Sequence, residues 1–312
     1  MKQTFFLLIT VFLFSSCSRS NYLPSEKMWN YEKFRNRQQT FNSTDGKIKY
    51  VDRGEGPVIL LLHGVPSSSW LYRRMIDGLV NGGHRVIAPD MLGFGSSDSP
   101  KGYETYSGEN HAARLLALMD HLKIDSWSHV MHDAGGLWTW EMLSQNPEKV
   151  VNLIILNSVI YQEGFHPPMK MKPGIFAKIA MWGYNNGITT KILLNKLFDM
   201  GLNEDILTKA DVEGYKKPLL ENKTKAMYYF FTQTCKALPE YSTVLQNLDI
   251  PAMVVWGKND KMLQWTPQSE QVKKDLKIEE KNIHFIDATH FIQEEKPEEI
   301  NQLILKFISR KE

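Results

Sequence analysis

The fold of this chain is decided by the stretch VMHDAGG, residues Val130–Gly136. The residues just before it are typical of a strand, and those from Leu137 onward are typical of a helix. Gly135 and Gly136 allow a strand and a helix to pack closely at a sharp turn, which exposes the side chain at its apex. The sequence therefore predicts a strand–turn–helix unit with Asp133 at the apex, although Asp and Gly also suit ordinary loops.

Asp133 occupies the place that Ser holds in the G-x-S-x-G nucleophile elbow. An Asp nucleophile forms an alkyl ester rather than an acyl enzyme. Met131 stands where many elbows carry Gly. The motif therefore indicates a type of reaction more than a substrate.

The composition limits the class of protein. The chain has 312 residues, of which 42% are hydrophobic, and this is enough for a large core in one domain with an insertion or in two domains. Its net charge of +2 argues against nucleic acid as a main partner. The two cysteines, Cys17 and Cys235, do not predict a disulfide framework, because Cys17 falls in a segment that we expect to be processed.

The N-terminus predicts export. Residues 1–17 combine Lys2, a short apolar run and small residues before Cys17, which is typical of a signal peptide. The ending FSSC resembles a bacterial lipobox, so we expect lipidation of Cys17 and an anchor in a membrane facing the periplasm or the cell exterior. Ordinary secretory cleavage, giving a soluble periplasmic protein, is the alternative. Residues 18–40 are polar and are predicted to be a tether or N-terminal arm.

Strand and helix patterns alternate after residue 45, which predicts a parallel α/β sheet. The predicted strands before a break are residues 47–52, 58–62, 85–89 and 150–156, together with the strand of the elbow, which is entered at residues 125–129. Residues 250–256 and 281–287 are the predicted strands after the break. Ligands of such sheets gather at the carboxyl ends of the strands. His63, Asp90, Asp133 and Asn157 follow strands in this way, so they are predicted to share one crevice.

Three motifs together carry a family resemblance. His63-Gly64-Val65-Pro66 follows a buried strand, Asp90-x-x-Gly-x-Gly-x-Ser97 precedes a helix, and Asp133 sits on the elbow. The chain thus resembles the α/β-hydrolase superfamily, and more narrowly its epoxide hydrolase and haloalkane dehalogenase branch. The resemblance implies an α/β-hydrolase core over residues 41–157 and 249–312, a mostly parallel sheet flanked by helices, and an inserted helical cap over residues 158–248.

The resemblance also implies a catalytic triad. Asp133 would be the nucleophile, His290 the base, and Asp260 the acid that orients the histidine. The backbone N–H groups of Val65 and Ala134 would form the oxyanion hole. Without the resemblance, Asp260 is an Asp in a polar turn and His290 a packing histidine.

The cap is rich in tyrosine, and epoxide hydrolases of this family use two cap tyrosines to protonate the epoxide oxygen. From rough position, Tyr184 and either Tyr228 or Tyr229 are the candidates, and Trp182 is a candidate to line the pocket. Packing alone also explains each of these aromatic side chains.

The sequence also bears on which leaving group Asp133 would displace, a halide or an epoxide oxygen. Typical haloalkane dehalogenases carry Asn and Trp at the positions of Val65 and Ala134, and neither residue here has a polar side chain for a halide. We therefore expect epoxide hydrolysis, with haloalkane dehalogenation second and a non-catalytic ligand-binding lipoprotein third. The expected substrate is a small apolar molecule with an electrophilic carbon. No compact set of His, Cys and carboxylates predicts a metal site, and no cofactor is implied. The sequence does not indicate an oligomeric state.

Overall fold

The computed structural model describes residues 30–204, 206–221 and 223–310. The predicted signal peptide and Cys17 lie outside the described residues. No helix in the described part of the chain is long and apolar enough to cross a membrane.

An eight-stranded sheet forms the centre of the molecule, with the order β1-β2-β4-β3-β5-β6-β7-β8. β1 and β2 pair antiparallel, as do β2 and β4, whereas all pairs from β4 to β8 are parallel. The prediction of a mostly parallel α/β sheet is therefore confirmed. The strands are β1 (Gln39–Ser43), β2 (Gly46–Arg53), β3 (Val58–Leu62), β4 (Arg85–Asp90), β5 (Trp127–Asp133), β6 (Val150–Ser158), β7 (Ala252–Gly257) and β8 (Ile283–Ile286).

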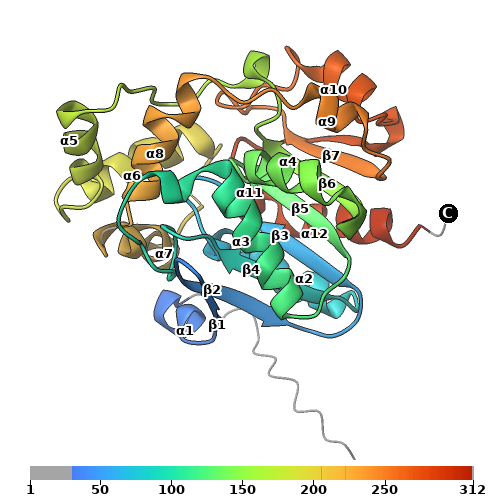
Figure 1. The fold of residues 1–312 in the computed structure, drawn as a ribbon, viewed down its shortest axis with the longest axis horizontal. Helices are drawn as coiled ribbons and strands as arrows, with labels where there is room; N and C mark the ends of the chain where they lie inside the picture. The colour runs from blue at the N-terminus through green and yellow to red at the C-terminus, as the bar shows by residue number, and fades with distance from the viewer. Residues whose placement is uncertain (1–29, 205, 222, 311–312) are drawn as a thin grey trace, which may run out of the picture.

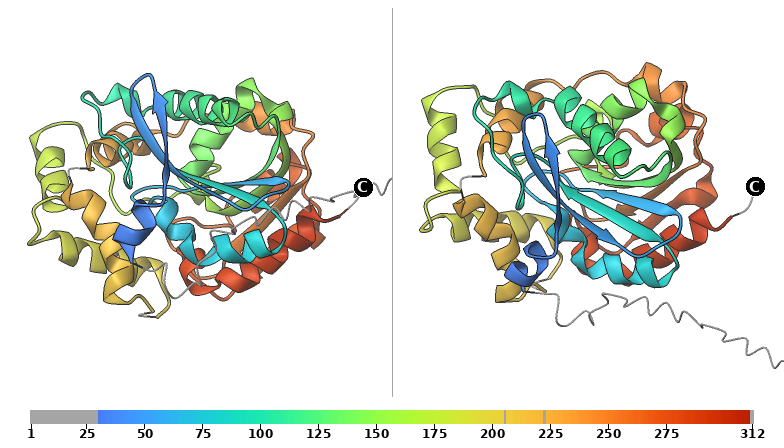
Figure 2. Two further views of the ribbon diagram at one scale, coloured as in Figure 1. Left: turned by 90° about the horizontal axis from the view of Figure 1, so that it is seen from below. Right: turned by 60° about the horizontal axis from the view of Figure 1, so that its bottom comes forward.

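Helices cover both faces of this sheet, which explains why β3 and β7 are continuous apolar runs. Figure 2 shows α3 (Gly108–His121) and α4 (Gly135–Gln145) on one face, and α2 (Arg73–Asn81) and α12 (Pro297–Ile308) on the other. Ile59 to Leu62 of β3 are fully buried between the two layers. The shorter helices of this core are α9 (Ser242–Gln246), α10 (Ser269–Asp275) and α11 (Ile292–Glu295).

The segment between β6 and β7, where a cap is predicted, is helical. It holds α5 (Ile175–Gly183), α6 (Thr190–Gly201), α7 (Lys209–Leu220) and α8 (Lys225–Thr232). These helices gather beyond one end of the sheet (Figure 1). The active-site motifs at the carboxyl ends of the strands therefore face this helical segment.

The last part of the segment predicted as a tether or N-terminal arm packs against the core. α1 (Tyr31–Arg35) is a short helix, and Tyr31 and Phe34 pack edge-on against Trp70 with ring centroids 5.4 and 5.1 Å away. The Gln38 side-chain amide then donates to the Asp90 carboxylate at 2.9 Å, and β1 begins at the next residue. Tyr31 and Phe34 lie three residues apart, so they share one face of the helix and bury together.

Candidate active site

Asp133 sits at the end of β5 in a left-handed backbone conformation, with φ of +52°. A Cβ at Gly135 would lie 2.7 Å from the carbonyl oxygen of His63, and a Cβ at Gly136 would lie 2.4 Å from the Ser158 Oγ. Only glycine fits at either position, which is why the strand can turn directly into α4. The sharp turn aims the Asp133 side chain away from the sheet, as the sequence predicts.

The two carboxylate oxygens of Asp133 have different surroundings. Oδ1 accepts a hydrogen bond from the backbone N–H of Val65 at 2.6 Å, and the backbone N–H of Ala134 also bonds to the carboxylate. Oδ2 lies 3.7 Å from Nε2 of His290. A Cβ at Gly64 would lie 2.2 Å from Oδ1, so this position also requires glycine. Oδ1 is thus fixed by a backbone donor, and Oδ2 faces the histidine.

His290 is oriented by Asp260. The histidine Nδ1 lies 2.9 Å from Asp260 Oδ2, so Nδ1–H donates to the carboxylate and Nε2 is turned toward Asp133. Asp260 Oδ1 accepts from the backbone N–H groups of Met262 and Leu263 at 2.8 and 3.0 Å. The structure therefore brings together the three side chains that the sequence predicts as a triad.

The charges of this triad are coupled. Burial lowers the pKa of His290, but the adjacent Asp260 and the charge of Asp133 outweigh it, so the pKa lies above the usual value. Burial raises the pKa of Asp260, but the charge of His290 and the hydrogen bonds from His290 and Asn157 bring it below the usual value. For Asp133 burial dominates and raises the pKa. The result is an ionised Asp260 that holds His290 and makes it a stronger base.

Asn157 and His132 support the triad. The sequence predicted Asn157 only as a member of the crevice and gave His132 no role. The Asn157 side-chain amide donates to Asp260 Oδ2 at 2.6 Å, and its oxygen accepts from the Gly257 N–H at 2.8 Å. His132 Nε2 lies 2.9 Å from the carbonyl oxygen of His290. Because burial lowers the pKa of His132 well below its usual value, the ring is neutral and donates that hydrogen bond from Nε2. Their positions at the ends of β5 and β6 were the available signals.

The crevice predicted from the strand ends holds Asp133 but not its other members. His63 orders the loop beside it, because its Nε2 accepts from the Met91 N–H at 3.0 Å and its Nδ1 lies 2.8 Å from the Gly64 carbonyl. Asp90 is buried and accepts the backbone N–H of Ser69 at 2.8 Å. Both side chains hold loop backbone near Asp133 by hydrogen bonds, and neither lines the cavity.

A narrow cavity reaches Asp133 and His290 between the core and the cap. The cavity volume is about 30 Å³, enough for two or three waters at about 10–15 Å³ each. A substrate must therefore displace flexible side chains as it enters. The cavity is lined by Val65, Pro66, Asp133, Phe165, Pro167, Pro168, Tyr184, Leu197, Met227, Phe230, Phe231, Met262, Leu263, His290 and Phe291.

Tyr184 lines this cavity, but the other cap candidates do not. Trp182 is 63% exposed, because residues two apart on a helix point to opposite sides and Tyr184 takes the inner one. On α8 the cavity side is taken by Met227, Phe230 and Phe231. The prediction of pocket roles is therefore wrong for Trp182, for Tyr228 and for Tyr229.

The two α8 tyrosines have other contacts. Tyr228 stacks on Tyr103 with ring centroids 4.3 Å apart, and its hydroxyl accepts from the Gly174 N–H at 3.1 Å. Tyr229 borders a separate hollow together with Trp138 and Glu141. Neither side chain reaches the triad.

The cap is bonded directly to the segment that carries His290. The carbonyl oxygen of Gly201, at the end of α6, accepts the backbone N–H groups of His290 and Phe291 at 3.1 and 2.9 Å. The Glu295 carboxylate accepts the backbone N–H of Asn203 at 3.1 Å. The position of His290 therefore depends on the position of the cap.

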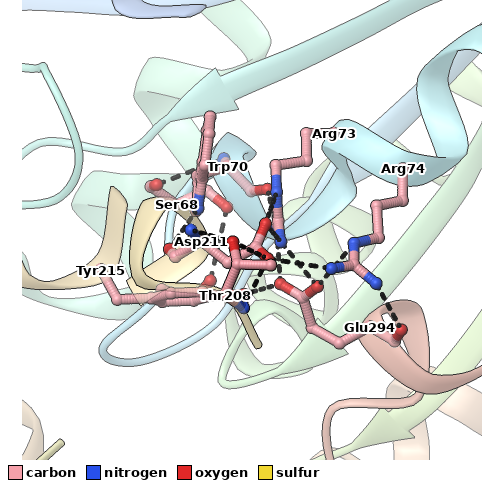
Figure 3. Close-up of polar contacts among 9 residues, drawn as sticks. Ser68, Trp70, Arg73, Arg74, Thr208, Asp211, Tyr215 and Glu294 are labelled. Atoms are coloured by element: carbon pink, nitrogen blue, oxygen red, sulfur yellow. Dashed lines mark hydrogen bonds and ion pairs between the residues drawn. The ribbon is translucent and has the colours of Figure 1, made fainter. Parts of the chain in front are cut away.

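A buried network of charged side chains also joins the cap to the core and to the histidine segment (Figure 3). Arg73 of α2 donates to Glu294 Oε2 at 2.8 Å and, through Nε, to Asp211 Oδ1 of α7 at 3.1 Å. Tyr215 of α7 donates its hydroxyl hydrogen to Glu294, and Arg74 lies 3.1 Å from Asp211 Oδ2. Two arginines thus balance two carboxylates from the core, the cap and the histidine segment.

No group of three His, Cys, Asp or Glu side chains within residues 30–204, 206–221 and 223–310 is arranged to hold a metal ion.

Comparisons with known proteins agree with this fold. A family model described as the alpha/beta hydrolase fold matches residues 57–201. The chain is similar to a haloalkane dehalogenase of Mycolicibacterium paratuberculosis, with 28% identity over 84% of this chain and 87% of the relative. It is also similar to epoxide hydrolase 3 of Xenopus tropicalis, with 26% identity over 84% of this chain and 74% of the relative. An epoxide hydrolase structure from Vigna radiata shares the fold, with a TM-score of 0.68 and 22% identity over 87% of this chain and 97% of that chain.

Replacing Glu294 by Gln tests the buried network. The change leaves the fully buried Arg73 without one of its two charge partners, so we expect the free energy of unfolding to fall by about 3–5 kcal/mol. The control is Asp52→Asn, which breaks a pair with Arg85 whose side chains are 22% and 28% exposed. That change should cost less than about 1 kcal/mol. Equal losses in urea unfolding of the two variants would contradict the assignment.

Proposed function

The chain belongs to the α/β-hydrolase superfamily, in the branch that contains epoxide hydrolases and haloalkane dehalogenases, and from that premise we propose that this enzyme hydrolyses epoxides to diols through an alkyl ester on Asp133. The observation that carries the proposal is that the two oxygens of the Asp133 carboxylate have different partners. Oδ1 is bonded to the Val65 N–H, and Oδ2 faces His290. Such a carboxylate has one oxygen prepared to become the ester carbonyl and another that is free to attack.

In the first step, Oδ2 of Asp133 attacks an epoxide carbon and the ring C–O bond breaks. The leaving oxygen takes the proton of the Tyr184 hydroxyl. Tyr184 is suited to this role because it lines the cavity and burial raises its pKa, so the phenol is protonated before the reaction. General-acid help of this kind contributes roughly 10²–10⁴-fold in rate.

In the second step, Nε2 of His290 takes a proton from water, and the hydroxide adds to the ester carbon of Asp133. The charge that develops on Oδ1 is held by the N–H groups of Val65 and Ala134. Each such donor is worth roughly 10²–10³-fold. Collapse expels the diol, whose oxygen takes the proton from His290. One epoxide and one water thus give one diol. The Asp133 carboxyl group then releases the proton left by the attacking water, and the Tyr184 phenolate takes up one proton, so both groups return to their starting states.

Haloalkane dehalogenation is the second candidate, because a relative carries that name. A halide needs hydrogen-bond donors at the point where it leaves. Apart from Asp133 and His290, Tyr184 is the only side chain with a polar hydrogen among the described residues that line the cavity. A phenol can transfer a proton to an alkoxide, which an epoxide requires, so the cavity favours epoxides.

The substrate and the location are part of the same proposal. The cavity wall is made mostly of Pro, Phe, Met and Leu side chains, which favours a small apolar molecule. The leader-like residues 1–17 support export, with a lipid on Cys17 holding the enzyme at a membrane.

The variant His290→Phe tests the ester mechanism. It lacks the base for the second step, so the ester should accumulate and intact-mass spectrometry should find an adduct equal to a whole epoxide on Asp133. The control is the same variant with Asp133→Asn added, which should gain no mass. An alkyl adduct formed from a haloalkane would support dehalogenation instead. No adduct from either class would favour a non-catalytic ligand-binding protein.

Tyr184→Phe tests the acid. We expect the rate of ester formation from an epoxide to fall by about 10²–10⁴-fold in stopped-flow measurements, because the leaving alkoxide loses its proton donor. The matched control is Tyr229→Phe on α8, which borders the separate hollow and should change the rate less than about twofold. If both variants react like the parent enzyme, Tyr184 is not the proton donor.

A further inference from the structure

The cap carries a concentrated apolar surface. Eleven large hydrophobic side chains are exposed in the described part of the chain, and six of them lie on α5, on the turn after it or on the start of α6. They are 54–84% exposed. We call them the cap patch: Ile175, Phe176, Ile179, Trp182, Ile188 and Ile192.

Core packing does not explain the cap patch. α5 already uses its inner side, where Ala177 and Met181 are buried and Tyr184 follows at the end of the helix. Single exposed apolar residues are normal, but a cluster of large ones marks an interaction surface. Figures 1 and 2 show α5, in yellow-green, at the outer edge of the molecule, away from the sheet.

The charged side chains of the segment that carries the patch have one sign. Residues 164–198 contain five lysines and neither Asp nor Glu, whereas the whole chain has 37 basic and 35 acidic residues. All five lysine side chains belong to exposed residues. They are Lys170, Lys172, Lys178, Lys191 and Lys196. An apolar helix with Trp and Phe on its outer face and lysines around it is typical of helices that lie in a lipid interface.

The beginning of the described chain contacts the cap. α1 is joined to α7 of the cap, where Arg35 contacts Glu221 at 2.7 Å. The 29 residues before Asn30, which include the predicted lipid site, therefore connect to the fold beside the cap. An anchor there would hold the cap near the membrane surface.

We propose that the cap patch docks on an anionic lipid surface, with Phe176 and Trp182 at the boundary of headgroups and acyl chains and the lysines on lipid phosphates. A second copy of this chain is a poorer occupant, since a twofold contact would bring two sets of five lysines together with no carboxylate among residues 164–198 to pair them. Pro167, Tyr184 and Leu197, from the segment that carries the patch, line the active-site cavity. Docking would therefore bring the cavity close to molecules dissolved in the lipid.

The test places an environment-sensitive fluorophore on Phe176→Cys in the full chain. The matched control is Lys281→Cys. The Lys281 side chain is 62% exposed and belongs to the α/β core, far from the cap along the chain. The parent chain treated with the same reagent gives the background from Cys17 and Cys235. Each protein is mixed with phosphatidylcholine vesicles that contain or lack phosphatidylglycerol.

We expect the label at 176 to shift to the blue and to be quenched by nitroxide-bearing lipid only with the anionic vesicles, while the label at 281 stays unchanged. Adding Lys172→Glu, Lys178→Glu and Lys191→Glu should weaken this response at least about tenfold without lowering the melting temperature. A label at 176 that does not respond, or responds no more than the label at 281, overturns the proposal. A shift that depends on protein concentration without vesicles also overturns it and assigns the patch to a second copy.

Discussion

The structure depends on how Asp133 is held at the end of β5, where its carboxylate is presented. Its backbone has φ of +52°, a conformation that residues other than glycine rarely adopt. Such a conformation costs about 1–3 kcal/mol, which the surroundings must offset. The carbonyl oxygen of Asp133 accepts the Ser158 hydroxyl at 2.9 Å and the Val159 N–H at 3.0 Å, while Val65 holds the side chain. The close approach of Gly135 to β3 and the irregular register between β5 and β6 follow from the same requirement.

The cap takes part in this arrangement because it is bonded to the histidine segment rather than resting on it. Gly201 receives two backbone hydrogen bonds from His290 and Phe291, and Arg73 joins α7 to Glu294. A large opening of the cap would disturb the base itself. Substrate entry therefore depends on movement of flexible side chains such as Met227, which line the nearly filled cavity.

Local patterns in the sequence were enough to predict the parallel sheet and the elbow, because each depends on short motifs at strand ends. The roles of Asp260 and His290 came only from the family resemblance. The cap was harder. α7 is not evident from the local pattern, because Pro218 lies in its last turn although the helix begins at a capping box. The pocket side of a cap helix depends on its packing partner, which no local pattern encodes, and for this reason only Tyr184 among the proposed aromatic residues reaches the cavity. α1 was missed because its aromatic residues bury against Trp70, far away in the sequence.

The central claim is that Asp133 itself gives an oxygen atom to the product. The most direct measurement is a single turnover of the unmodified enzyme, in excess over an epoxide, in water enriched in oxygen-18. Mass spectrometry then locates the label in the diol and in the peptide that contains Asp133. The account predicts an unlabelled diol and one oxygen-18 atom in Asp133, because water attacks the ester carbon. A labelled diol with unlabelled Asp133 would mean direct attack of water on the epoxide and would contradict the account.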